Sequence, residues 1–199
     1  MQTIQIIIYD GFDELDAVAP YEVLAAAGLA VQLVTSPAPR DVCSAHHLSF
    51  TPHGTLARAP STLIVPGGGW VSRAPTGAWA EVQDGALPAA IRERHAAGTT
   101  IAGVCSGVML LASAGLLEDR PCVTHHGAID DLRDSGAEVL SDARVVDDGD
   151  ILTAGGVTSA IDLALHIVER ELGAEAADAG ARRIEYDRRG PVLSPRRRR

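Results

Sequence analysis

The sequence lacks several features that define whole classes of protein. Its 199 residues contain no apolar run near the roughly 20 residues that a membrane-spanning helix needs. Residues 1–3 lead directly into a predicted strand without a basic region or a cleavage site, so we expect no signal peptide. Three cysteines, an odd number without close spacing, argue against a disulfide framework. We therefore expect a cytoplasmic protein with no membrane partner.

The common metal-binding patterns are also missing. The chain contains neither a CxxC pair nor an HExxH helix. We expect no metal, and the chemistry considered below requires no organic cofactor.

Charge is unevenly distributed along the chain. The net charge is −9, but the last twelve residues hold six arginines and no acidic residue, which leaves −15 on the rest. An acidic body disfavours binding to nucleic acid phosphates. Residues 196–199 are consecutive arginines, which suit a basic arm or a solvated tail. We expect one domain over residues 1–190 and a basic, flexible tail over residues 191–199.

What the chain does contain is an alternation of short apolar strands and helices. Predicted strands cover residues 4–9, 30–35, 61–66, 99–104, 120–126 and 151–154. Predicted helices cover residues 20–27, with Pro20 in the first turn, and 86–97, 108–117, 129–135, 159–172 and 175–183. Between them we expect short irregular pieces with a small hairpin within 36–60 and a loop or a short turn at 75–85. We also expect extended chain at 138–140 and 143–146 that turns back at Asp148-Gly149. This alternation predicts an α/β fold with an open, doubly wound, mainly parallel sheet and helices on both faces.

Residues 99–117 contain the strongest functional signal. A β-branched apolar stretch leads to Gly103, Cys105 and Gly107, and an Ala- and Leu-rich helical pattern follows. G-x-C-x-G at a strand-to-helix turn is the cysteine form of the nucleophile elbow, in which small flanking residues permit a strained turn that presents the nucleophile. A helix N-terminus is expected to favour the reactive thiolate. A buried cysteine is more often a small apolar residue, but the glycine spacing favours catalysis here.

Four loops that follow predicted strands form the candidate site, because ligands of doubly wound sheets bind beyond the carboxyl ends of the strands. The loops are residues 10–16, 67–70, 105–106 and 124–126. Cys105 is the candidate nucleophile, and the backbone N–H groups of Ser106 and Gly68 are candidate donors to a developing negative charge. Together the loops contain the parts of a covalent mechanism.

The other residues of these loops have structural interpretations as well. Residues 67–69 suit a flexible turn as much as a backbone that approaches a ligand. Asp16 is ordinarily a helix-capping or solvated carboxylate. His125 is either a base or orienting group for Cys105, or a hydrogen-bonded histidine at a strand end. Three further residues are expected to be structural: Cys43, Cys122, and Asp162 as the buried partner of a backbone or arginine group.

Six segments together carry a resemblance that covers nearly the whole chain. They are LDAVAPYEVL (15–24), LIVPGGG (63–69), GVCSGVMLLASAGLL (103–117), VTHH (123–126), GGVTSAIDLALHIVERELG (155–173) and RIEYDRRGPVLSP (183–195). With these segments the chain resembles the DJ-1/PfpI superfamily of class I glutamine amidotransferase-like proteins, and within it the isonitrile hydratases. The resemblance implies a flavodoxin-like fold and a homodimer whose site lies near the subunit interface.

The resemblance also implies residue roles. Asp16, in the LD segment, would be the general acid/base beside Cys105. The implied reaction adds water to an isonitrile, a small-molecule substrate, and gives an N-substituted formamide through a thioimidate on Cys105, without a cofactor. Ser106 stands where the hydratases usually have Thr and keeps a hydroxyl that would position the acid or the water. The implied substrate and oxyanion contacts are Gly68, Gly69, Ser106, His125 and His126, of which His126 stands where Trp is usual.

Two other functions fit the same residues. One is a thiol hydrolase or glyoxalase-like enzyme that pairs Cys105 with His125 and acts on amides, peptides or 2-oxoaldehydes. The other is a non-catalytic small-molecule or oxidation sensor, in which Cys105 captures a ligand or is oxidised without turnover. Related domains are fused to helix-turn-helix modules of regulators, and we expect no such module after the sheet of this chain.

Overall fold

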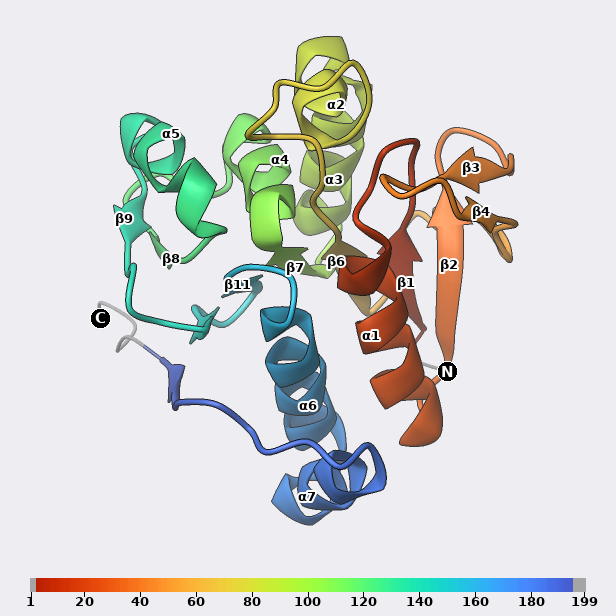
Figure 1. Cartoon of the computed structure of the whole chain (residues 1–199), viewed down its shortest axis with the longest axis vertical. Helices are drawn as coiled ribbons and strands as arrows, with labels where there is room; N and C mark the ends of the chain where they lie inside the picture. Colours follow the sequence, from red (N-terminus) through yellow and green to blue (C-terminus); the bar gives the residue numbers. More distant parts are fainter. Residues whose placement is uncertain (1–2, 195–199) are drawn as a thin grey trace.

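One eight-stranded sheet organises the computed structural model, which describes residues 3–194 (Figure 1). Its strands are β1 (Ile4–Ile7), β2 (Val31–Thr35), β5 (Gly54–Thr55), β6 (Thr62–Val65), β7 (Thr100–Val104), β10 (Val145–Asp147), β11 (Ile151–Ala154) and β12 (Val192–Leu193). The order is β12-β10-β11-β7-β6-β1-β2-β5, and every pairing is parallel except that of β10 with β11. The mainly parallel sheet predicted from the sequence is confirmed.

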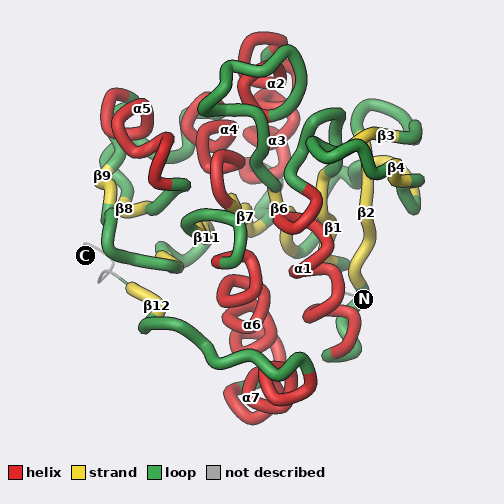
Figure 2. The backbone as a smooth tube through the Cα atoms, in the orientation of Figure 1, coloured by secondary structure: helices red, strands yellow, loops and turns green. Residues whose placement is uncertain are grey.

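Helices cover both faces of this sheet (Figures 1 and 2). One face carries α1 (Glu14–Ala26), α6 (Ser159–Leu172) and α7 (Ala174–Arg183), and the other carries α2 (Ala78–Asp84), α3 (Ala86–Ala96) and α4 (Val108–Ser113). The short helix α5 (Ile129–Asp134) follows the 3-10 turn η2 (His126–Ala128), and a second 3-10 turn, η1 (Cys105–Gly107), precedes α4. All residues of β1, β6 and β11 are buried, as expected for parallel strands covered on both sides.

Two small sheets complete the structure. The strands β3 (Val42–Cys43) and β4 (Ser49–Phe50) form the antiparallel hairpin expected within residues 36–60. The strands β8 (Pro121–Cys122) and β9 (Glu138–Val139) pair in parallel, outside the main sheet. The strand expected over residues 120–126 is therefore limited to its first part, because the chain turns at His125 to enter η2.

The helix of the first βαβ unit begins earlier than expected. Asp13 caps α1 by accepting a hydrogen bond from the Leu15 N–H at 3.1 Å. Pro20 therefore lies inside the helix, whereas the sequence predicted it in the first turn. Proline has no N–H for the carbonyl four residues earlier, that of Asp16, so the ordinary helical bond is missing at that point. The prediction was wrong because it relied on the preference of proline for helix starts and overlooked the Asp13 cap.

Two further local predictions were wrong. Residues 78–84 form α2 in place of the expected loop, and Gly77 and Gly85, both with positive φ, bound it. The helix expected to reach residue 117 ends at Ser113. Glycine at such boundaries ends a helix without the steric cost of a side chain.

Beyond the predicted domain boundary at residue 190, the chain still belongs to the sheet. Val192–Leu193 forms β12, which pairs with β10 at the sheet edge. The four arginines on which the basic tail was predicted lie outside the described residues. Among the described helices, none is long and apolar enough to cross a membrane.

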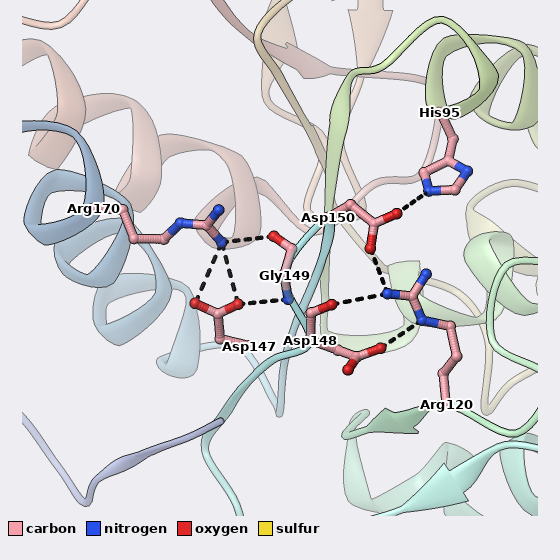
Figure 3. A network of polar contacts seen from close by, with 7 residues as sticks. All are labelled: His95, Arg120, Asp147, Asp148, Gly149, Asp150 and Arg170. Carbon is pink, nitrogen blue, oxygen red and sulfur yellow. Dashed lines mark hydrogen bonds and ion pairs between the residues drawn. The ribbon is translucent and has the colours of Figure 1, made fainter. Parts of the chain in front are cut away.

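A polar network fixes the turn between β10 and β11 (Figure 3). Arg120 donates to Asp148 Oδ2 at 2.6 Å and to Asp150 Oδ1 at 2.5 Å, and His95 pairs with the same Asp150 at 2.8 Å. On the other side of the turn, Arg170 contacts Asp147 at 3.3 Å. The network joins α3, the residue before β8, and α6 to the antiparallel turn that the Asp148-Gly149 pair predicted.

Candidate active site

Cys105 is the first residue of η1 and lies directly after β7, in a strained turn. Its φ of +54° lies in the left-handed region, which is uncommon for a residue with a side chain and is often found at functional sites. A side chain at Gly107 would collide with the carbonyl oxygens of Val65 and Pro66, and one at Gly67 would come within 2.6 Å of the Ser106 nitrogen. The geometry is that of a nucleophile elbow, packed tightly against the loop after β6.

Hydrogen bonds from two further loops also hold the elbow in place. The Cys105 N–H donates to the carbonyl of Gly155 at 2.9 Å, after β11. The Thr124 hydroxyl donates to the carbonyl of Cys105 at 2.8 Å. The loops after β7, β8 and β11 therefore meet at the cysteine, and the last of these was not among the loops predicted to form the site.

Asp16 lies in the first turn of α1 and is completely buried. Its Oδ2 accepts a hydrogen bond from the Gly67 N–H at 2.9 Å, while Oδ1 has no partner among the described residues. Burial raises the pKa of Asp16 to about 8, although the Gly67 N–H and the nearby Cys105 thiol act in the opposite direction. The carboxyl group is thus protonated in most molecules at neutral pH, with one oxygen free for proton exchange.

The Cys105 thiol does not have the low pKa expected from a helix N-terminus. Only 6% of the residue is exposed, and burial, followed by the charge of Asp16, raises the pKa of the thiol to about 12. The N–H groups of Val157 and Ser106 lower it without compensating. The backbone N–H groups favour the thiolate, as expected from the sequence, but burial outweighs them and the resting group is a thiol. The charge of Asp16 raises the cost of ionising Cys105, so the pair resists a double negative charge.

The glycine loop and Ser106 contact each other directly. The Gly68 N–H, an expected oxyanion donor, donates to Ser106 Oγ at 3.0 Å. Gly69 lies in the turn that leads to α2, where its carbonyl accepts from the Ala74 N–H at 3.0 Å. The backbone N–H groups that act on the sulfur are those of Ser106 and Val157. Gly68 thus orients the Ser106 hydroxyl in this structure.

The two histidines form a separate group. His125 Nδ1 accepts the Gly127 N–H at 3.1 Å, and its ring packs over Gly156, where an added Cβ would lie 2.9 Å from His125 Cδ2. The rings of His125 and His126 lie 4.1 Å apart between centroids. Burial, and next His126, lower the pKa of His125. No contact of the described residues joins either histidine to Cys105; the carboxyl of Asp16 is the titratable partner of the thiol.

The similarity of the whole chain to known proteins agrees with this arrangement. The model of the DJ-1/PfpI family matches residues 2–170. The chain belongs to the DJ-1/PfpI family. Among its relatives, isonitrile hydratase of Pseudomonas putida is 31% identical over 183 residues, which are 90% of this chain and 76% of that protein. The Parkinson disease protein 7 homolog of Danio rerio is 27% identical over 177 residues, which are 86% of this chain and 90% of the relative.

Solved structures of the DJ-1/PfpI family share the fold. A THiJ/PfpI family protein from Pseudomonas syringae superposes with a TM-score of 0.81 at 27% identity, over 96% of this chain and 77% of that one. The flavodoxin-like α/β architecture implied by the resemblance is thereby confirmed.

The sequence analysis missed three groups that contact or act on Cys105, and it interpreted Asp162 correctly. The missed groups are the Val157 N–H, the Thr124 hydroxyl and the Gly155 carbonyl. Their signal was present in the GGVT and VTHH segments, which were read only as a helix start and a histidine pair. Asp162 is buried as expected and accepts from Arg144 Nε at 2.8 Å, from the Tyr186 hydroxyl at 3.0 Å and from the Arg189 N–H at 3.1 Å.

Proposed function

We propose that this protein is an enzyme of the isonitrile hydratase type, which converts R–N≡C and water into R–NH–CHO. The observation that carries the proposal is the pair of Asp16 and Cys105. A fully buried carboxyl group with one unpartnered oxygen lies beside the elbow thiol, and its pKa of about 8 suits proton exchange near neutral pH. The relative from Pseudomonas putida supports the same reaction class.

In the first half of the reaction, Cys105 Sγ bonds to the terminal carbon of the isonitrile. Asp16 gives a proton to that carbon and receives the proton of the thiol. The product is a thioimidate, R–N=CH–S–Cys105. The Ser106 and Val157 N–H groups lower the pKa of Cys105 and so stabilise the negative charge on sulfur as its proton leaves.

In the second half, water attacks the thioimidate carbon. Asp16 accepts a proton from this water and passes a proton to the nitrogen, which gives R–NH–CH(OH)–S–Cys105. The hydroxyl proton then returns to sulfur through Asp16 as the C–S bond breaks and the formamide leaves. Ser106 Oγ accepts the Gly68 N–H, so its own hydrogen is free to hold the water. Acid–base assistance of this kind is worth about 10²–10⁴-fold in rate.

The structure favours the two alternatives less. A hydrolase that pairs Cys105 with His125 needs contact between the two, and His125 Nδ1 is occupied by the Gly127 N–H. An oxidation sensor needs an accessible thiolate, whereas the Cys105 thiol is buried and its pKa is about 12. Asp16 is the partner that both alternatives leave without a role.

The test follows formamide formation from an alkyl isonitrile. We expect Cys105→Ala to abolish turnover. Asp16→Asn keeps an oxygen for the Gly67 N–H but cannot exchange the proton, so we expect kcat to fall by about 10²–10⁴-fold. Cys43→Ser, at an exposed position, is the matched control and should retain full turnover. Turnover that survives in Asp16→Asn would remove the acid/base assignment, and absence of turnover with every isonitrile would remove the proposed reaction.

We also propose that the enzyme is a homodimer. Leu15 and Val18, three residues apart on α1, are 40% and 41% exposed beside the Asp16 turn and form an apolar surface that a second copy of the chain could cover. Light scattering after size exclusion should give twice the chain mass, and Val18→Glu should shift it toward the monomer.

A further inference from the structure

Asp13 lies in the midst of the site but has no role in the reaction described above. Its N–H donates to the carbonyl of Gly67 at 2.8 Å, and the N–H of the same Gly67 donates to Asp16. A side chain at Gly68 would come within 2.7 Å of the Asp13 nitrogen. The loop after β1 is thus locked against the glycine loop, one residue away from the Ser106 contact.

The charge of Asp13 acts on all three titratable groups of the site. It raises the pKa of Asp16, of Cys105 and of His125. For Cys105, the carboxylates that act on the thiol are those of Asp16 and Asp13, and because Asp16 is mostly protonated at neutral pH, Asp13 supplies the negative charge there. Among the described residues, no cation acts on the sulfur to balance the charge of Asp13.

Neighbouring basic side chains are already paired with other acids. Arg40 bonds to Asp10 at 2.6 Å, His46 contacts Glu14 at 2.7 Å, and Arg73 contacts Asp131 at 2.9 Å. Within residues 3–194, Asp13 itself takes part in no ion pair, and its Oδ1 accepts only the Leu15 N–H at 3.1 Å. Its charge is consequently not cancelled at close range and extends into the site.

We propose that Asp13 makes the Cys105 site discriminate by charge, so that it admits neutral and cationic molecules and rejects anionic ones. A reacting molecule that carries a carboxylate or sulfonate would approach Cys105 against the charge of Asp13. For the reaction proposed above, on which this extension to substrate rests, the R group of the isonitrile carries no negative charge. The charge selection itself applies to any electrophile that reaches the sulfur.

Charged thiol reagents test the selection without any isonitrile. The trimethylammonioethyl and sulfonatoethyl methanethiosulfonates have the same reacting group: the thiolate sulfur bonds to the reagent's sulfenyl sulfur, and methanesulfinate leaves. Rates are measured by intact mass on the Cys43→Ser protein, since Cys43 is exposed whereas Cys122 is fully buried. Each rate is divided by that of a free cysteine peptide, and Cys105→Ala identifies the labelled residue.

The cationic reagent should be favoured over the anionic one by about 5- to 10-fold, and the ratio should shrink at high ionic strength. Asp13→Asn keeps a side-chain oxygen for the α1 cap and should fold normally. It should lower the ratio of the two rates at least threefold, because it removes about one unit of negative charge close to the sulfur. Asp178→Asn on α7, at the far end of α6, changes net charge equally and should leave the ratio unchanged.

An equal ratio in the parent and Asp13→Asn would overturn the proposal, as would failure of both reagents to reach Cys105. A second arm compares isocyanoacetate with its methyl ester, which share one skeleton and differ in charge. We expect kcat/KM to favour the ester, and Asp13→Asn to reduce the preference. If neither compound is turned over while the reagent ratio still depends on Asp13, the hydratase reaction fails and the charge selection stands.

Discussion

Removal of the Asp16 charge should make Cys105 a stronger acid. Burial is the first cause of the high thiol pKa and the charge of Asp16 is the second. Since the pKa of Asp16 is about 8, that group is ionised throughout the range in which the thiol titrates near 12. Asp16→Asn retains the volume and the burial but removes the charge. The thiol pKa should therefore fall, in the direction opposite to that expected if Asp16 stabilised a thiolate.

The size of the change follows from electrostatics. Two unit charges about 4 Å apart at an effective dielectric constant of about 20 repel by roughly 4 kcal/mol, which sets an upper limit of about 3 pH units. Hydrogen bonding by the new amide and solvent screening reduce this, so we expect a fall of about 1–2 pH units. Because the rate of alkylation follows the thiolate fraction, iodoacetamide at about pH 9.5, below the thiol pKa of both proteins, should react about 10- to 100-fold faster with Asp16→Asn than with the parent.

The assay measures the thiolate directly as well. Absorbance of the thiolate in the ultraviolet, taken across pH 8–12 in the Cys43→Ser background, gives the pKa of Cys105 by difference from Cys105→Ala. Glu14→Gln removes a carboxyl from the same turn of α1, one that contacts His46 and does not act on the thiol, and so serves as the matched control. A thiol pKa that is unchanged or higher in Asp16→Asn would refute the electrostatic coupling on which the mechanism depends.

Two further predictions concern stability. Burial raises the pKa of Asp150, but hydrogen bonds from Arg120 and His95 outweigh it and lower the pKa to about 2. A carboxyl group whose pKa is lowered by folding stabilises the fold above its unfolded pKa, so its contribution, about 1 kcal/mol after allowance for exposure, should vanish between about pH 4 and 2. Urea unfolding at both pH values should show this loss in the parent and not in Asp150→Asn. Gly107→Ala should destabilise the folded protein by about 3 kcal/mol or more, because the added methyl group meets two carbonyl oxygens. Gly115→Ala, where φ is positive but the space is open, should cost about 1 kcal/mol. Equal melting temperatures for the two variants would contradict the tight packing of the elbow.

The parts of the fold that the sequence predicted are those with a local pattern. Largely apolar stretches such as residues 61–66 indicate strands buried on both faces, and the glycines around Cys105 indicate the elbow. The start of α1 was missed because a cap is a single side-chain bond, and Asp13 in a DGFD stretch looks like a turn residue. Helix α2 was missed because seven residues between two glycines leave too short a periodicity to recognise.

The electrostatics of the site were not predictable in the same way. Whether Cys105 is a thiolate depends on how much water the whole fold removes from it, and α1, the glycine loop and α6 approach it from distant parts of the sequence. A helix N-terminus is visible in the sequence, but the desolvation that outweighs it is not. For the same reason His125 looked like a natural partner of the thiol, since it ends a neighbouring strand, although its ring faces Gly156.

A high thiol pKa and a high carboxyl pKa are consistent with catalysis because one environment produces both. Burial keeps a proton on Asp16 and a proton on Cys105, so the resting pair is neutral and stable in a dry site. A substrate carbon that accepts the carboxyl proton removes the obstacle to sulfur ionisation at the moment of attack, because Asp16 then takes the thiol proton in turn. The cysteine is in this way reactive toward a molecule that can accept a proton at the attacked carbon, and slow to react with ordinary oxidants and alkylating agents. The slow alkylation expected of the parent protein and the fast turnover expected with isonitriles thus have the same physical cause.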